Sequence, residues 1–181
     1  MKKACVTVLC SVLALASCNA YAGTAYVNSR NGVSIRSEPS TGSDVLCVLP
    51  FRSEVEVGKK KDGWYKAECE DKEGYVNAEY VQDYDPVSDM EYCGEWRITA
   101  YAETGYPCAN GQYPTVGYTV ACNSLPFGAE IYIEGVGFRT VEDRGPGWLG
   151  DNWCDLYLGI TYDCVQWGDQ YRNVYISKRS G

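Results

Sequence analysis

The sequence contains no histidine among its 181 residues. This absence excludes Ser-His-Asp triads and Cys-His nucleophile pairs, because both need an imidazole base. No Cys-x-x-Cys pair occurs either, so the usual spacing of zinc ligands is missing and we expect no metal or other cofactor. General acid or base chemistry is therefore left to Asp, Glu, Tyr, Lys or Cys side chains.

Positive charge is also scarce. The chain has 16 Lys and Arg against 24 Asp and Glu, and two of the lysines are Lys2 and Lys3 at its start. Nucleic-acid binding needs a basic face, so the composition excludes it as a function class. A neutral glycan ligand imposes no such requirement.

Long apolar runs are missing beyond the first residues. The two N-terminal lysines precede an uncharged, mostly apolar run over residues 4–17, and Ala20-Tyr21-Ala22 has the small-x-small pattern of a signal-peptidase site. This run is shorter than the about 20 residues of a membrane helix, so residues 1–22 are predicted to be a signal peptide. Leu15-Ala16-Ser17-Cys18 resembles a lipobox, which leaves lipidation of Cys18 as an alternative. We expect no membrane-spanning segment in the mature chain.

Helix-length periodic stretches are absent, and short alternating or apolar runs are separated by Gly, Pro, Asn and Asp. This pattern is typical of small barrels or sandwiches. We predict an all-β protein with one module at residues 23–84 and a second at residues 96–181. The polar segment at residues 85–95, which contains Pro86, is predicted to be a linker.

Three short motifs mark the first module: Val33-x-Ile35-Arg36-x-x-Pro39, Gly63-Trp64-Tyr65-Lys66, and Gly74-Tyr75-Val76 with Tyr80-Val81. Lys59 to Gly63 is predicted to form a solvated, charged hairpin tip. The series resembles a bacterial SH3-type domain, a small barrel that commonly tethers wall-active enzymes to peptidoglycan peptides or glycans. Trp64 and Tyr65 are either ligand contacts or parts of the barrel core and rim.

Cysteines are frequent after residue 22, as expected of disulfide partners in an exported protein. They are Cys47, Cys69, Cys93, Cys108, Cys122, Cys154 and Cys164. A bond between Cys47 and Cys69 would stabilise the first module by roughly 3 kcal/mol. In the second module we expect Cys108 to pair with Cys122 and Cys154 with Cys164, leaving Cys93 over, but spacing alone does not fix connectivity.

The second module carries a longer series of motifs. They are Thr99-Ala100-Tyr101, Val120-Ala121-x-Asn123, Leu125-Pro126-x-Gly128 with Tyr132-Ile133, Glu142-Asp143-x-Gly145 followed by Gly150, Asp155-Leu156-Tyr157, and Trp167-Gly168 with Val174-Tyr175-Ile176. The series resembles the three-aspartate (3D) domain, a six-stranded double-psi β-barrel. That domain is found in secreted wall-remodelling proteins and in the catalytic core of membrane-bound lytic transglycosylase A.

The resemblance implies cleavage of the β-1,4 bond between N-acetylmuramic acid and N-acetylglucosamine, with the muramyl 6-hydroxyl as nucleophile. It makes Asp155 the catalytic acid and base. Asp143 would be its neighbour, raising the pKa of Asp155 or stabilising an oxocarbenium-like charge. Without the resemblance, Asp143 would be a turn carboxylate that bonds the amides of Arg144 and Gly145, and Asp155 a solvated aspartate at the start of a strand.

Three positions depart from the family pattern. Asn123 replaces the first of the three aspartates, and an amide cannot hold or release a proton near neutral pH. Gly145-Pro146 replaces a usual Gly-Gly, and the spacing before Asp155 is one residue longer, which makes Asp151 a substitute candidate. Asn123 either positions substrate or marks a barrel that binds glycan without cutting it.

Further candidate sugar contacts are Tyr101, Thr115, Trp148 and Trp153, although the aromatic rings could instead cover the ends of the barrel. The expected partners are peptidoglycan glycan strands and stem peptides, and the expected location is secreted or in the cell wall. The leading hypothesis is a peptidoglycan lytic transglycosylase with an SH3-type anchor. The alternatives are a non-catalytic wall-binding or wall-loosening protein, and a secreted protein that dimerises through its odd cysteine.

Overall fold

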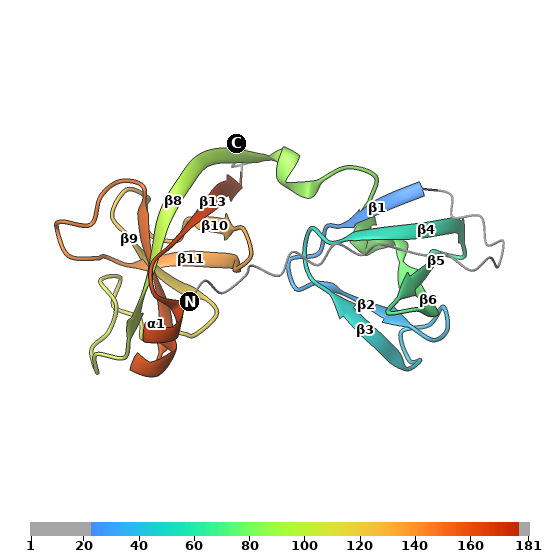
Figure 1. Ribbon diagram of the computed structural model, residues 1–181, viewed down its shortest axis with the longest axis horizontal. Coiled ribbons are helices and arrows are strands. Elements are labelled where there is room, and N and C mark those ends of the chain that lie inside the picture. The colour runs from blue at the N-terminus through green and yellow to red at the C-terminus, as the bar shows by residue number, and fades with distance from the viewer. Residues whose placement is uncertain (1–22, 178–181) are drawn as a thin grey trace, which may run out of the picture.

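Two β-sheets account for most of the computed structural model, which describes residues 23–177 (Figure 1). The first is a seven-stranded sheet with the order β3-β2-β6-β5-β4-β1-β7, and the second is a closed barrel with the order β10-β11-β9-β12-β8-β13. The all-β prediction, an SH3-like module followed by a six-stranded barrel, is confirmed. The predicted signal peptide and Cys18 lie outside the described residues. Within those residues, no helix is long and apolar enough to cross a membrane.

The first sheet follows the alternating pattern of its sequence. In β2, Val33 and Ile35 are buried while their neighbours are only half-buried, as the two-residue period of a strand requires. Gly74 is fixed by packing, because a Cβ there would lie 2.7 Å from a methyl carbon of Ile35. The strands are β1 (Gly23–Val27), β2 (Val33–Arg36), β3 (Val45–Leu49), β4 (Glu54–Lys61), β5 (Trp64–Cys69), β6 (Lys72–Asn77) and β7 (Val81–Gln82).

The barrel surrounds an apolar core that includes Ile98, Val120, Ile131, Leu156 and Val174. Strands β9 and β11 are parallel, as are β8 and β12, and the other pairs are antiparallel. This mixed pairing is consistent with a double-psi barrel. The elements are β8 (Met90–Ala102), β9 (Thr119–Cys122), β10 (Glu130–Ile133), β11 (Gly137–Asp143), β12 (Trp153–Gly159), α1 (Thr161–Trp167) and β13 (Gln170–Ser177).

The segment expected to be a linker is largely structured. Asp85 caps the 3-10 helix η2 (Pro86–Asp89) by accepting a hydrogen bond from the Val87 N–H at 3.2 Å. Strand β8 then begins at Met90, where it pairs with Ser177 of β13. Ser88, Asp89, Glu91 and Glu95 are exposed, which accounts for the polar composition of the segment, and β13 pairs with its backbone from Met90 onward.

Cysteine pairing differs between the two modules. Cys47 and Cys69 form a disulfide between β3 and β5, with their Cα atoms 6.6 Å apart, as the sequence suggested. The two pairs expected in the barrel were wrong, because Cys108 is not bonded to Cys122 and Cys154 is not bonded to Cys164; the five barrel cysteines are in the thiol form in this structure. Strand register is the reason: Cys122 on β9 lies directly opposite Cys154 on β12, whereas Cys108 is in a loop and Cys164 in α1.

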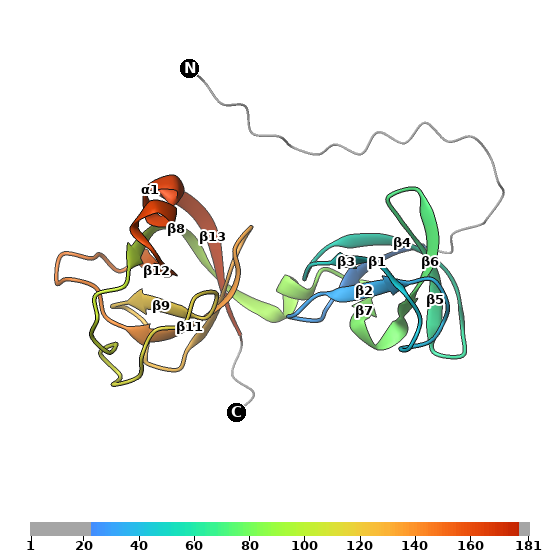
Figure 2. The same cartoon turned by 90° about the horizontal axis from the view of Figure 1, so that it is seen from below.

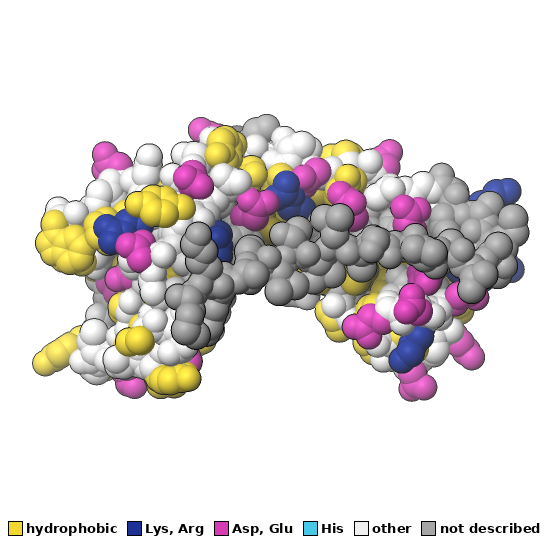
Figure 3. Space-filling view, in the orientation of Figure 1, with side chains coloured by type: hydrophobic (Ala, Val, Ile, Leu, Met, Phe, Trp, Pro, Cys, Tyr) yellow, Lys and Arg dark blue, Asp and Glu magenta, His cyan; other side chains and the backbone are white. Residues whose placement is uncertain are grey.

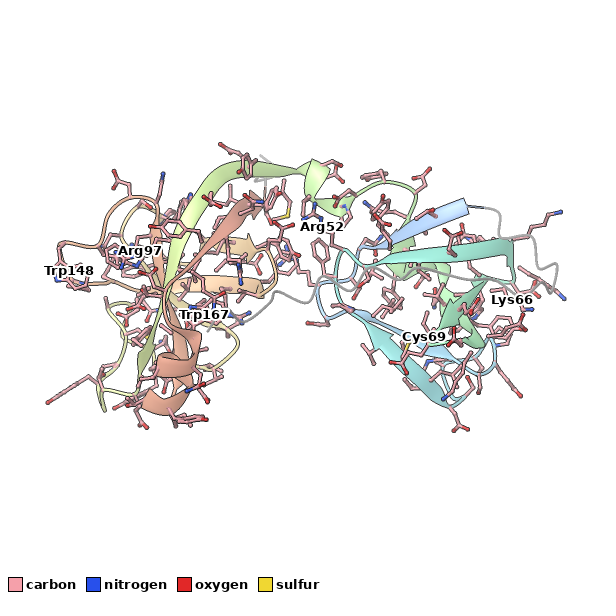
Figure 4. All side chains as sticks on the ribbon, viewed as in Figure 1. Arg52, Lys66, Cys69, Arg97, Trp148 and Trp167 are labelled. Atoms are coloured by element: carbon pink, nitrogen blue, oxygen red, sulfur yellow. A yellow bond between two sulfur atoms is a disulfide. The ribbon has the colours of Figure 1, made fainter. Side chains whose placement is uncertain are left out.

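The modules lie side by side along the long axis of the molecule (Figures 1 and 2). Phe51 of the first module packs edge-on against Tyr132 and Phe138 of the barrel, with ring centroids 5.0 and 4.9 Å apart. Beside it, Arg52 pairs with Asp85 at 2.9 Å and with Glu134 of the barrel at 2.5 Å. Figure 4 shows Arg52 between the two sheets. We call these contacts the module junction.

Candidate functional site

Four strands of the barrel bring the predicted catalytic residues into one row. Asp155 on β12 lies opposite Thr99 of β8 on one side and Ala121 of β9 on the other, and Ala121 in turn lies opposite Asp143 of β11. Because strands are about 4.8 Å apart, the backbones at Asp143 and Asp155 are separated by roughly 10 Å. We call Thr99, Asp155, Ala121 and Asp143 the carboxylate row.

The carboxylate row lies on the outer face of the barrel. The residues next to its members, such as Cys154 and Leu156 around Asp155, are buried in the barrel core. Side chains alternate between faces along a strand, so Thr99 and Asp155 point away from that core. The loop at residues 103–118 reaches this outer face at Asp143, which accepts a hydrogen bond from the Ala109 N–H, and Ala121 is only 3% exposed.

Asp155 is half-buried, and Thr99 controls its orientation. The Thr99 hydroxyl donates to Asp155 Oδ1 at 2.8 Å, and Trp153 Nε1 donates to the same hydroxyl oxygen at 2.8 Å. Burial raises the pKa of Asp155, the Thr99 hydrogen bond lowers it, and the charge of Asp143 raises it, with a net rise. A carboxyl group of this kind keeps its proton to higher pH than an ordinary aspartate, which is what a general acid needs.

Asp143 receives three hydrogen-bond donors. The N–H groups of Ala109 and Arg144 each donate to Oδ1 at 2.8 Å, and the Tyr101 hydroxyl donates to Oδ2 at 3.1 Å. Burial, followed by the charge of Asp143, raises the pKa of Tyr101, so its hydroxyl stays a donor. The alternative role of Asp143 as a turn carboxylate is found in part, since it bonds the amide of Arg144 but not that of Gly145.

Asn123 supports the neighbouring loop. Its Oδ1 accepts a hydrogen bond from the Gly145 N–H at 3.1 Å, and its Nδ2 donates to the carbonyl oxygens of Pro146 and Leu149 at 3.2 and 3.3 Å. The amide therefore fixes the loop between β11 and β12 onto the end of β9. In this structure its polar atoms are already used by the protein.

Two tryptophans form an aromatic surface near Asp155. Trp148 is 70% exposed and packs against Trp153, with ring centroids 5.2 Å apart. The guanidinium of Arg97 lies 3.9 Å above the Trp153 ring. Figure 4 places Trp148 and Arg97 close together, and Figure 3 shows hydrophobic side chains at this end of the barrel, away from the first module. This surface is linked to Asp155 by two hydrogen bonds, from Trp153 to the Thr99 hydroxyl and from that hydroxyl to Asp155.

The structure places Thr115 and Asp151 outside the carboxylate row. Thr115 is exposed in the turn before β9, where its N–H donates to Thr119 Oγ1 at 2.8 Å. Asp151 is exposed in the turn before β12, and its carbonyl accepts from the Ser124 hydroxyl at 2.6 Å. Nothing in the sequence around Thr99 indicates a role for it in the candidate site. Only the register of β8 with β12 reveals its contact with Asp155.

The first module carries two hollows that share Trp64 as a wall. One, of about 250 Å³, lies on the side of Asn77 and Tyr80. The other, of about 420 Å³, is lined by Pro39, Lys59, Lys61, Asp62, Trp64, Lys66 and Tyr75. Lys66 is paired with Glu73 at 2.9 Å. The hollow therefore combines the rings of Trp64 and Tyr75 with the ammonium groups of Lys59 and Lys61 and the carboxylate of Asp62.

Comparison with known proteins bears on the first module. Residues 31–82 match the family model of the bacterial SH3 domain, which confirms the resemblance for this part of the chain. A search of curated proteins finds no match. Among residues 23–177, no group of three or more His, Cys, Asp or Glu side chains is arranged to hold a metal ion. The SH3 domain indicates association with peptidoglycan or the cell wall, and such domains are typical of wall-associated or secreted proteins.

Proposed function

We propose that this chain is a secreted peptidoglycan-remodelling enzyme, a lytic transglycosylase held to its substrate by the SH3 module. The observation that supports the proposal best is the carboxylate row, in which a half-buried Asp155 with a raised pKa lies two strands away from Asp143. The similarity of the barrel motifs to the 3D domain supplies the substrate class. The bacterial SH3 domain is consistent with the same wall context.

In the proposed reaction, Asp155 donates its proton to the glycosidic oxygen as the bond from the muramyl C1 to that oxygen breaks. The Asp143 carboxylate stabilises the positive charge that develops at the sugar ring. The muramyl 6-hydroxyl then attacks C1 and returns its proton to Asp155. No water is consumed, so one acid–base residue suffices where an ordinary glycosidase needs two carboxyl groups. A positioned acid of this kind contributes typically about 10²- to 10⁴-fold to the rate.

The aromatic surface of Trp148 and Trp153 is suited to position the glycan. Aromatic rings stack on the apolar faces of pyranose rings, and the high exposure of Trp148 leaves one of its faces open. Because Trp153 also donates to Thr99, sugar binding and orientation of Asp155 involve the same side chain.

The test is digestion of purified peptidoglycan by the full chain, with soluble fragments identified by mass spectrometry. We expect 1,6-anhydro muropeptides from the wild type and a loss of at least 100-fold in Asp155→Asn, on the order of a general acid's contribution. Asp163→Asn is the matched control, since Asp163 is an exposed carboxylate of α1 in the same barrel. Products with free reducing ends would show that the enzyme is a hydrolase and not a lytic transglycosylase. Wild-type protein that releases no fragments would contradict the proposal.

A non-catalytic wall-binding protein is the second candidate. It is favoured by Asn123, whose amide is used by the loop rather than by acid–base chemistry, and by the hollows around Trp64. Co-sedimentation with insoluble peptidoglycan tests it. Saturable binding that is weakened in Trp64→Ala and unchanged in Asp155→Asn, without soluble fragments, would support this candidate over the enzyme. The exposed Tyr106→Ala is a control for Trp64→Ala.

A further inference from the structure

Cys122 and Cys154 face each other in the core of the barrel. They are directly opposed in the antiparallel pair of β9 and β12, and both side chains are 0% exposed. Opposed residues of an antiparallel pair have Cα atoms about 4.5 to 5.5 Å apart, inside the range that a disulfide spans.

The surroundings of the two sulfur atoms differ. Cys122 Sγ lies 3.5 Å from the Ser124 hydroxyl oxygen and near the backbone N–H groups of Ser124 and Leu125. The neighbouring Cys154 thiol, together with these donors, lowers the pKa of Cys122 to about 6 against the opposing effect of burial. The same contact and burial raise the pKa of Cys154.

We infer that Cys122 and Cys154, which are thiols in this structure, form a second disulfide in the oxidised protein, one that joins β9 to β12 beside the carboxylate row. In this step two thiols lose two protons and two electrons and gain one S–S bond. A disulfide-bonded oxidant, either a thiol–disulfide oxidoreductase or oxidised glutathione, takes the electrons and becomes two thiols. Because both sulfurs are fully buried in the closed barrel, the exchange takes place during folding.

The bond would fix the segment that carries most of the site. The chain between the two cysteines includes Asn123 and Asp143, and Cys154 directly precedes Asp155. Joining β9 to β12 therefore holds Ala121 and Asp155 at constant separation. This inference does not depend on the proposed reaction, because it concerns the covalent structure of the barrel only.

Disulfide mapping tests the inference. The full chain is reduced, denatured and refolded in oxidised and reduced glutathione, after which free thiols are blocked with N-ethylmaleimide. Trypsin cuts after Arg97, Arg139, Arg144 and Arg172, so residues 98–139 contain Cys122 and residues 145–172 contain Cys154. The pairs Cys108–Cys122 and Cys154–Cys164 would each lie within one peptide, whereas the inferred bond links the two peptides.

We expect the linked peptide pair in the wild type and in Cys108→Ala and Cys164→Ala, and its loss in Cys122→Ala. Reductant should lower the melting temperature of the barrel by roughly 10 °C in the wild type. The effect should persist in Cys47→Ala/Cys69→Ala and vanish in Cys122→Ala/Cys154→Ala. Maleimide on both Cys122 and Cys154 in a wild-type sample that has formed Cys47–Cys69 would overturn the inference. A bond from Cys154 to Cys93 would overturn it equally.

Discussion

Replacing Phe51 should uncouple the two modules. Its ring makes two edge-on contacts with the barrel, to Tyr132 and Phe138. Each aromatic pair contributes about 0.5 to 1.5 kcal/mol beyond the area it buries. Phe51 is half-buried, so the lost apolar burial adds about 1 kcal/mol more. Phe51→Ala should therefore weaken the module junction by about 2 to 4 kcal/mol.

The neighbouring ion pairs contribute less to the junction. Arg52 is about a quarter exposed, and its partners Asp85 and Glu134 are more exposed than Arg52 itself. Pairs of this kind are worth about 0.2 to 1 kcal/mol each. Arg52→Ala should thus have a smaller effect than Phe51→Ala, and high salt should reduce the effect of Arg52→Ala but not that of Phe51→Ala.

Differential scanning calorimetry and small-angle X-ray scattering measure this coupling. In the wild type, the junction should make the two modules unfold close together and hold them at a fixed separation. In Phe51→Ala, the first unfolding event should move down by about 5 to 15 °C, and the scattering should show a broader range of separations. Tyr106→Ala is the control, because Tyr106 is 75% exposed. Identical melting and scattering for Phe51→Ala, Arg52→Ala and wild type would refute a fixed junction.

Three further predictions concern the carboxylate row and its loop. In Thr99→Val the pKa of Asp155 should rise, because the hydrogen bond that lowers this pKa is lost. The alkaline limb of the pH–activity profile should therefore move to higher pH. An unchanged limb would show that Thr99 does not set the pKa of Asp155. The raised pKa means that the folded state loses stability as pH rises from the ordinary carboxyl range through the pKa of Asp155. Asp155→Asn should therefore melt higher than wild type at pH 7 and lose this advantage below about pH 4, and an equal difference at both pH values would contradict this. Asn123→Asp should lose its two bonds to carbonyl oxygens and be less stable by about 1 to 3 kcal/mol in urea unfolding, and unchanged stability would show that the amide does not fix the loop.

Local pattern predicted much of the fold because burial in this protein follows the strand period closely. The alternating residues Glu130-Ile131-Tyr132-Ile133 form β10, in which Ile131, Tyr132 and Ile133 are buried, and α1 ends at Trp167 with Gly168 as its C-cap. The start of β8 was missed, because its pairing with β13 depends on residues about 80 positions later in the chain.

The candidate site shows the same division between local and non-local information. Asp143 and Asp155 could be selected from motif similarity. The strand register, which places Ala121 between them and Thr99 on the other side of Asp155, cannot be read from the sequence. Cysteine pairing failed for the same reason, since Cys122 is closer in sequence to Cys108 but opposite Cys154 in the sheet. The module junction was also missed, because Phe51 lies in a turn where a single apolar residue gives no periodic signal.

The replacement of an aspartate by Asn123 is best understood together with the loop it holds. Gly145 is confined there, because a Cβ would lie 2.5 Å from a methyl carbon of Leu149, and Pro146 has no N–H to offer a carboxylate. The groups that face position 123 are one N–H and two carbonyl oxygens, which an amide satisfies in full and a carboxylate would meet with two repulsive contacts. The causes that act on the pKa of Asp155 are burial, Thr99 and Asp143, none of which involves position 123. Asn123 therefore fits the altered loop sequence, and in the proposed reaction the acid at Asp155 does not depend on an aspartate at that position.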